Sequence, residues 1–278
     1  MALAPSPLRA PLLVAVARDS YLTPRVPFPD KQHMPLIKAP LYGQDITSGY
    51  GRKAPGGQQV GSTPSELKPK MRKLLSIFAR RDTAGMATRL FDAFLRDTCR
   101  PPLYFDDASL NAAADAHPNI QFFCSAVLSA PNSPHRTTGH LRLHQALKAS
   151  NWDISKIAMP QNLGVPAFNL GSKVWESGDF ANGLGLMING VQHVYVIATH
   201  YTHDQKSGKY AIRLKYLLYD VFGLDDDDLR EYGAASPSWI TSDAAVGITA
   251  WWQLQHQFGY APYVTRIVLE KSFEAPAI

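Results

Sequence analysis

Two long stretches rich in β-branched and aromatic residues constrain the fold of this 278-residue chain more than any other feature. They run from Leu184 to Tyr201 and from Tyr210 to Val221, and a polar loop that contains Gly208 separates them. In the second stretch apolar and polar residues alternate, which is typical of a half-buried strand. The pattern predicts a long antiparallel hairpin, with one more strand at 263–270.

The part of the chain that precedes the hairpin has the residue spacing of helices. Ser62–Glu66 combines a hydroxyl cap, an early proline and a first-turn acid, which together predict the start of a helix. Helices are expected over 62–78, 83–95, 109–117, 118–130 and 138–149, and again over 225–230 and 243–257. The sequence therefore predicts an α+β fold, in which a helical N-terminal half is followed by an antiparallel sheet built on the hairpin.

Residues 1–63 resemble neither of these parts. Ten prolines and six glycines fall within the first 64 residues, where they interrupt any helical or strand period. We expect an extended arm, which either serves loading and delivery or is a plain disordered tail. The predicted organisation is an arm over 1–63, a helical region over 64–160 and a β-rich region over 161–278, with 64–278 forming one domain.

Hydropathy and charge exclude some classes of protein. No apolar run reaches the ~18–20 residues that a membrane-spanning helix needs. The early run Ala10–Ala17 is short and holds Pro11, so a secretory signal peptide is not expected. Residues 1–100 hold 16 Lys and Arg against 7 Asp and Glu, which gives the first predicted helix a basic face. That face fits a solvated surface or, less simply, contact with phosphates.

Several common active-site motifs are missing. The chain has neither a glycine-rich phosphate loop nor a nucleophile elbow. His140 and His144 have the spacing of a zinc-protease helix, but Leu141 replaces the glutamate that such a site requires. Cys99 and Cys124 are too few for a disulfide framework or a four-cysteine zinc site, which leaves one bridge or two free thiols.

Polar side chains gather at one end of the predicted hairpin. If the strands pair across the loop, the end of one lies beside the start of the other, which brings together Asn189, His193, Tyr219, Asp220 and Asp225. An amide, an imidazole, a phenol and a carboxylate suffice for general acid–base catalysis on a phosphate ester, with Asp220 and Asp225 as ligands if Mg²⁺ takes part. Structural roles fit equally well, because aspartates at strand ends often cap the next turn.

A second group of side chains lies near the end of the chain. The run Trp252-Gln253-Leu254-Gln255-His256 precedes Gly259 and Pro262, which are typical of a helix end. Core packing accounts for most of this run. His256 is the one member that we retain as a candidate for catalysis.

Two segments together resemble a proteobacterial domain family of unknown function. They are Leu218-Tyr219-Asp220-Val221-Phe222-Gly223-Leu224-Asp225 and the Trp252–His256 run, within a resemblance that covers residues 84–271. Members of that family resemble cargo of polymorphic-toxin and type VI secretion systems. Val221 stands where family members often carry histidine. The resemblance implies a role in contact-dependent bacterial competition and names no reaction.

A shorter resemblance implies a reaction. A strand that begins Gly208-Lys209-Tyr210 and ends Tyr219-Asp220 is similar to the toxic domain of colicin M-type bacteriocins, which hydrolyse the undecaprenyl-pyrophosphate linkage of lipid II. The resemblance implies that Asp220 is the essential carboxylate and Tyr219 its neighbour. The His-Arg pair expected a few residues later is missing, since Asp225–Asp228 occupies that stretch.

The leading hypothesis is therefore a secreted antibacterial effector that acts on a competitor's cell envelope, as a phosphodiesterase that cleaves lipid II. It would be made in the cytoplasm and act in the target's periplasm. Its expected partners are a cognate immunity protein, a secretion-system component, and a lipid-linked peptidoglycan precursor or membrane surface. The alternatives are a non-enzymatic membrane-perturbing toxin or a secretion-system adaptor, and, as a third class, attack on nucleic acid.

Overall fold

The fold is described from a computed structural model of the chain. The structure describes residues 3–18, 62–96, 103–126, 142–157, 161–163, 165–166, 168, 178–188, 191–224, 226–235 and 242–278. Cys99, His140, Asn189 and Asp225, which the sequence singled out, lie outside these residues.

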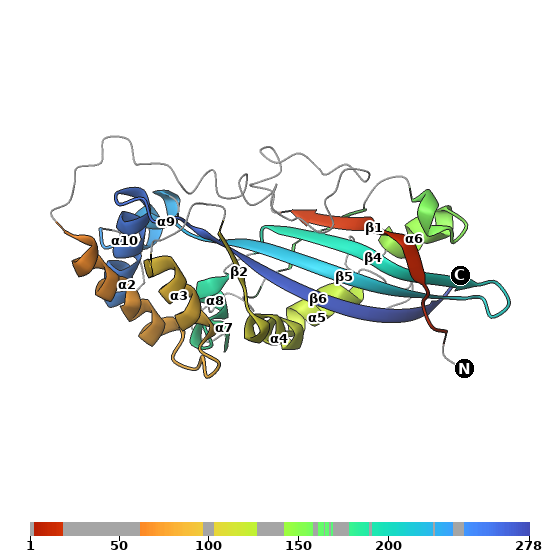
Figure 1. The fold of residues 1–278 in the computed structure, drawn as a ribbon, viewed down its shortest axis with the longest axis horizontal. Helices are drawn as coiled ribbons and strands as arrows, with labels where there is room; N and C mark the ends of the chain where they lie inside the picture. Colours follow the sequence, from red (N-terminus) through yellow and green to blue (C-terminus); the bar gives the residue numbers. More distant parts are fainter. Residues whose placement is uncertain are drawn as a thin grey trace.

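A six-stranded sheet forms the frame of the molecule, in the spatial order β2-β6-β5-β4-β1-β3 (Figure 1). The strands are β1 (Pro7–Arg18), β2 (Leu103–Asp106), β3 (Gln161–Leu163), β4 (His193–Asp204), β5 (Lys209–Phe222) and β6 (Tyr263–Pro276). The four central strands pair antiparallel. The two short outer strands run parallel to their neighbours, so the sheet is mixed and not purely antiparallel as expected.

The central strands β4 and β5 pair from Asp204 opposite Lys209 to His193 opposite Tyr219. β5 then pairs with β6 along its whole length. β4 begins later than the sequence predicted, because residues Leu184–Met187 form the short helix α8. Gly183 caps this helix with a φ of 89°, a left-handed conformation that glycine adopts readily.

The helices are α2 (Pro64–Phe78), α3 (Met86–Arg96), α4 (Ala108–Ala116), α5 (Pro118–Ala126), α6 (Arg142–Ala149), α7 (Gly178–Ala181), α8, α9 (Asp226–Tyr232) and α10 (Ser242–His256), with a 3₁₀ turn at Ile154–Lys156. Together with the sheet they confirm the α+β class. α2 begins with the predicted cap, in which Glu66 Oε2 accepts the Thr63 N–H at 2.7 Å. Strand β2 interrupts the helical region, so the N-terminal half is not helical throughout.

The first strand corrects the expectation of an extended arm over 1–63. β1 lies between β4 and β3 inside the sheet, and its residues Leu13–Val16 are each at most 1% exposed. The apolar run that was too short for a signal peptide is therefore part of a strand whose residues 13–16 are buried, a structure that such runs also fit. Pro7 and Pro11 are accommodated by irregular pairing between Pro7 and Leu12.

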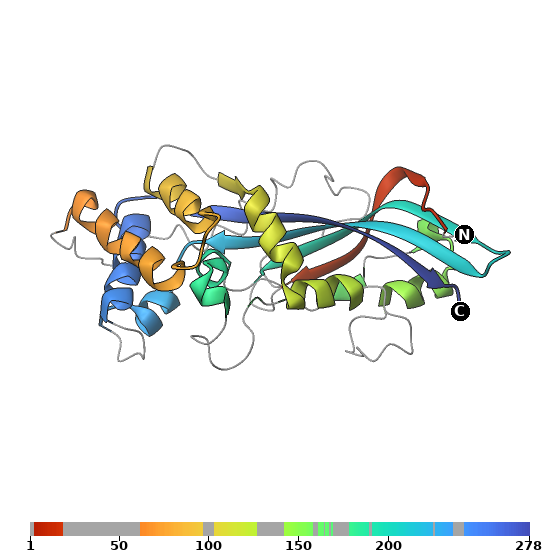
Figure 2. The same cartoon turned by 90° about the horizontal axis from the view of Figure 1, so that it is seen from below.

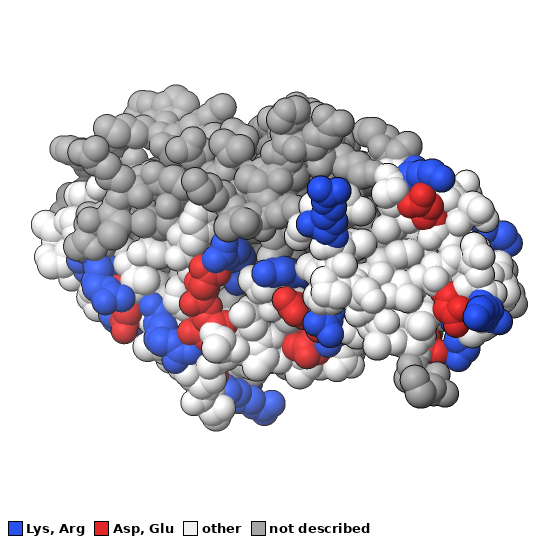
Figure 3. Space-filling view, turned by 45° about the vertical axis from the view of Figure 1, so that its right-hand side comes forward, with Lys and Arg blue, Asp and Glu red and all other residues white. Residues whose placement is uncertain are grey.

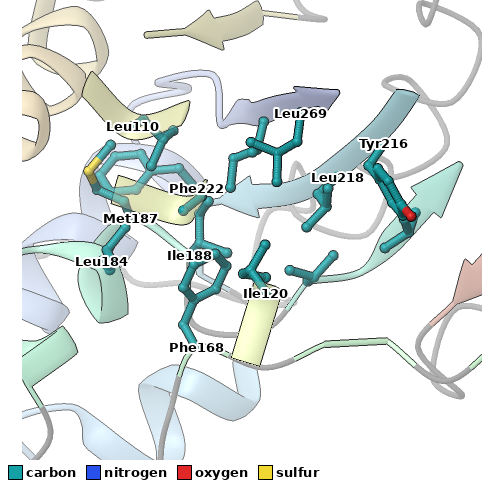
Figure 4. Packing of buried hydrophobic residues seen from close by; sticks show 14 of the residues in the cluster. Leu110, Ile120, Phe168, Leu184, Met187, Ile188, Tyr216, Leu218, Phe222 and Leu269 are labelled. Atoms are coloured by element: carbon teal, nitrogen blue, oxygen red, sulfur yellow. The ribbon is translucent and has the colours of Figure 1, made fainter. Parts of the chain in front are cut away.

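One face of the sheet carries the main core, shown in part in Figure 4. Residues of β4, β5 and β6 pack there against α4, α5 and α6 along the sheet and against α2, α3, α8 and α10 at one end (Figure 2). The opposite face carries a smaller apolar group, here called the second cluster, formed by Leu13, Val16, Tyr195, Ile197, Leu217, Tyr219, Val221 and Val264.

A buried polar pair connects α7 to the start of α5. His117 Nδ1 accepts the Asn119 N–H, so Nε2 carries the proton that it donates to Asp179 Oδ2 at 3.0 Å. The two side chains are 5% and 7% exposed. Removing one partner of a buried pair leaves the other without its hydrogen bond.

We expect Asp179→Ala to lower the free energy of unfolding by about 3 kcal/mol in urea denaturation. Asp92→Ala, which removes the exposed pair with Arg72, is the matched control and should cost at most about 1 kcal/mol. Equal effects from the two substitutions would contradict a structural role for the buried pair.

A second buried histidine should make stability depend on pH. His144 Nδ1 lies 3.0 Å from Tyr210 Oη, and burial lowers the pKa of His144 below its ordinary value of 6.5. The unfolded chain therefore binds more protons between the lowered pKa and 6.5. Stability from this group is complete above about 6.5 and is lost as the pH falls toward the folded pKa.

We expect the urea midpoint of the native chain to fall more steeply between about pH 7 and about pH 5 than that of the His144→Gln variant, which does not titrate. Parallel pH profiles for the two proteins would show that His144 contributes nothing to this dependence.

Candidate functional site

The structure brings together two of the residues that the sequence proposed, His193 and Tyr219. They are direct cross-strand partners on β4 and β5. Paired residues project from the same face of a sheet, and Tyr219 belongs to the second cluster. Both side chains are buried, and the Tyr195 ring lies 6.2 Å from His193 and 5.9 Å from Tyr219, between ring centroids.

Asp220 does not join this pair. Successive residues of a strand project to opposite faces, so Asp220 lies on the face opposite Tyr219. Its neighbours on that face of β5, Leu218 and Phe222, belong to the main core. Asp220 is buried, and its backbone carbonyl accepts a hydrogen bond from Thr265 Oγ1 at 3.1 Å. The side chain of Asp220 therefore projects from the opposite face of the sheet to those of Tyr219 and His193, although the three residues are close along the paired strands.

Two residues that sequence reasoning missed extend the pair across the sheet. Arg266 of β6 lies opposite Tyr219, and Asp106 of β2 lies opposite Arg266. We call the line formed by His193, Tyr219, Arg266 and Asp106 the polar row. On β1, the backbone of Arg18 continues the same line next to His193.

A bidentate ion pair closes the outer end of the polar row. Arg266 Nε and Nη2 donate to the two carboxylate oxygens of Asp106, at 2.6 and 2.7 Å. The guanidinium also lies over the Tyr104 ring, 5.7 Å from its centroid. A guanidinium has five N–H donors, and Asp106 occupies two of them. Among the described residues, no side chain other than Asp106 accepts a hydrogen bond of normal length from this guanidinium.

Burial and charge fix the protonation states within the row. Burial raises the pKa of the Tyr219 phenol well above its ordinary value, and the neighbouring charge of Arg266 opposes this shift. The hydrogen bonds to Asp106 raise the pKa of Arg266. At neutral pH the row therefore presents a protonated phenol beside a guanidinium cation.

Exposure increases along the polar row. The His193 side chain is completely buried, whereas the side chains of Arg266 and Asp106 are 30% and 46% exposed. Solvent therefore reaches the row from the Arg266 end. This arrangement can direct hydrogen bonds from Arg266 to an anionic oxygen at the exposed end, with the Tyr219 phenol and the His193 imidazole buried behind it.

The expected Mg²⁺ role of Asp220 and Asp225 stays a prediction. Within the part of the chain that the structure describes, no three His, Cys, Asp or Glu side chains are grouped so that they could hold a metal ion. Asp220 lies on the face opposite the polar row, and Asp225, its expected partner in binding Mg²⁺, falls outside the described residues.

His256 has contacts with the backbone that follows β5. Its Nε2 donates to the Leu224 carbonyl oxygen at 2.7 Å, and Gln255 binds both the N–H and the carbonyl of Leu224 at 2.9 Å. The His256 ring stacks on Trp252, 4.8 Å away between centroids. These contacts join the 218–225 segment to the 252–256 segment, the two segments on which the family resemblance depends. His256 itself lies away from the polar row.

The basic face of α2 is largely matched by neighbouring groups. Lys68 lies over the Tyr260 ring at 5.3 Å, Lys73 pairs with Asp243 at 3.4 Å, and Arg72 pairs with an aspartate of α3. Figure 3 likewise shows Lys and Arg interspersed with Asp and Glu over the face it draws. These contacts favour the solvated-surface interpretation over contact with phosphates.

Apolar exposure is low in the described part of the chain. There, Phe258 and Ile278 are the large apolar residues with exposed side chains. None of the helices described is both long and apolar enough to cross a bilayer.

Comparison with known proteins adds no assignment. No family model matches the chain, and neither a curated protein nor a solved structure matches it.

Proposed function

We propose that this chain is an antibacterial effector that hydrolyses a phosphate ester in a competitor's cell envelope, with a lipid-linked peptidoglycan precursor such as lipid II as its substrate. The observation that carries the proposal is the polar row, in which a base, a protonated phenol and a guanidinium share one register line on one face of the sheet. The motif resemblances supply the bacterial context.

The chemistry requires only groups of the row. His193 accepts a proton from water, whose oxygen attacks phosphorus while the bond from phosphorus to the leaving oxygen breaks. Tyr219 donates its proton to that leaving oxygen, and the N–H groups of Arg266 not used by Asp106 offset the charge on the other phosphate oxygens. Because His193 and Tyr219 are cross-strand neighbours, the proton then returns from the imidazole to the phenolate.

The proposal implies the partners expected above, namely a cognate immunity protein and a secretion-system component. Synthesis is in the cytoplasm of the producing cell, and the reaction takes place in the periplasm of the target.

The test is expression of the full chain in a susceptible bacterium, either in the cytoplasm or behind a periplasmic signal. We expect killing from the periplasm alone, and a loss of about 100-fold or more in lipid II hydrolysis for Tyr219→Phe and for Arg266→Gln. Arg213→Gln, on the same face of β5 but outside the row, is the matched control and should retain activity. Asp220→Asn should also retain it as long as the variant folds.

Other outcomes would redirect the assignment. If a folded Asp220→Asn variant lost hydrolysis while Tyr219→Phe stayed active, Asp220 would be the essential carboxylate, as the colicin M-type resemblance implies. Leakage of liposomes that contain no precursor would favour the membrane-perturbing class, and absence of toxicity in both compartments would favour an adaptor.

A further inference from the structure

The outer edge of β6 is only partly covered by another strand. On its inner side β6 pairs with β5 over all of Tyr263–Pro276, but on its outer side β2 pairs with Tyr263–Arg266 alone. Figure 1 shows β6 continuing far beyond β2. From residue 267 onward, no strand among the described residues pairs with this edge.

Two hydrogen bonds establish which peptide groups point outward. The Ala277 N–H donates inward to the Gly208 carbonyl at 2.8 Å, and the Val268 N–H donates outward to Asn111 Oδ1 of α4 at 3.0 Å. The register between β5 and β6 has no bulge, so even-numbered residues point outward. Glu270, Ser272 and Glu274 therefore present N–H and C=O groups that bond to no described residue.

Two of the three outward residues along this edge, Glu270 and Glu274, carry carboxylates. All three of these residues, Glu270, Ser272 and Glu274, are exposed. On the neighbouring strand β5, Lys215 is paired with Glu270 and Arg213 is paired with Ser272. Glu274 also accepts hydrogen bonds from Lys209 Nζ at 2.7 Å and from the Leu3 N–H at 3.0 Å. A strand added beyond β6 would lie directly against the acidic positions, so basic residues at alternate positions complement it.

Pairing with a second copy of this chain fits the edge poorly. An antiparallel two-fold pairing that uses the whole free edge is centred on Ser272, which places Glu270 of each copy opposite Glu274 of the other. Like charges directly opposite each other destabilise paired strands.

We propose that the free edge of β6 binds an extended segment of a partner protein by strand addition, and that basic residues alternate along this segment. Backbone hydrogen bonds to Glu270, Ser272 and Glu274 supply affinity, and the acidic side chains supply selectivity. This surface is separate from the polar row and does not depend on the hydrolytic proposal.

The test uses the full chain and a short peptide in which Lys alternates with Val, with a peptide in which Glu alternates with Val as its control. Fluorescence anisotropy should show the basic peptide binding about tenfold or more tightly. Ser272→Pro removes one outward N–H that β5 does not use and should weaken binding about tenfold, whereas Ser272→Ala keeps the N–H and should bind like the native chain.

Amide hydrogen exchange gives an answer even if the proline variant does not fold. The basic peptide should slow exchange at Glu270, Ser272 and Glu274 and leave the inward amides Lys271 and Phe273 unchanged. Equal binding of the two peptides, or no added protection at the outward amides, would overturn the proposal. A concentration-dependent dimer that protects the same amides without peptide would replace the partner with a second copy.

Discussion

A chain that begins at residue 64 should fail to fold cooperatively, although its sequence alone suggests a complete domain. The truncation removes β1, an inner strand whose Leu13, Val14 and Val16 side chains are at most 1% exposed. Burial of each such side chain is worth ~1.5–3 kcal/mol, against a total stability of ~5–15 kcal/mol for a typical domain. It also leaves the β4 edge without its partner. Circular dichroism with urea denaturation provides the measurement.

The matched control is a chain that begins at residue 7. It lacks the segment before β1, in which the Ser6 N–H bonds to Thr202 Oγ1, but it keeps the strand itself. We expect it to unfold cooperatively near the midpoint of the full chain. If the chain that begins at residue 64 also unfolded at that midpoint, β1 would be dispensable and residues 1–63 would be the separable arm that composition suggests.

Phe222→Ala should lower the free energy of unfolding by about 4 kcal/mol. The Phe222 ring lies where β5 meets the helices at one end of the sheet, 4.3 Å from Trp251 and 5.2 Å from Phe91 between centroids. It is 1% exposed, so its truncation leaves a cavity among rings supplied by several elements. The value can be measured by urea denaturation.

Phe258→Ala makes the same chemical change at a side chain that is 38% exposed. We expect its effect to stay within about 0.5 kcal/mol. Similar losses from the two substitutions would mean that the packing around Phe222 is not what supports the junction between sheet and helices.

Local patterns accounted for the parts of the fold whose causes are local. α2 begins where the cap at Thr63 and Glu66 predicts, because both groups lie within one turn of the helix. α10, over Ser242–His256, likewise follows from a continuous helical pattern. Lys209–Phe222 forms a strand because its alternation of residue types matches the period of a strand.

Contacts between distant residues were not predictable in the same way. Arg266 and Asp106 are 160 residues apart, and their pairing depends on β2 adding in parallel to β6. β1 was missed because the prolines around it suggested an arm more strongly than its short apolar run suggested a strand. The separation of Tyr219 from Asp220, in contrast, follows from the two-residue period of the strand that the sequence itself predicts.

The contacts of Gln255 and His256 with Leu224 determine at which of these three positions an amino-acid substitution would keep the hydrogen bonds. Both side chains bind main-chain atoms, which every amino acid at position 224 except proline would supply in full. Position 224 is therefore free to change its side chain as far as these bonds are concerned, whereas a change at 255 or 256 removes hydrogen bonds that no substitution at 224 restores. The Leu224 side chain packs against the main core, so among related chains exchanges between apolar residues at 224 should accumulate before changes appear at 255 or 256.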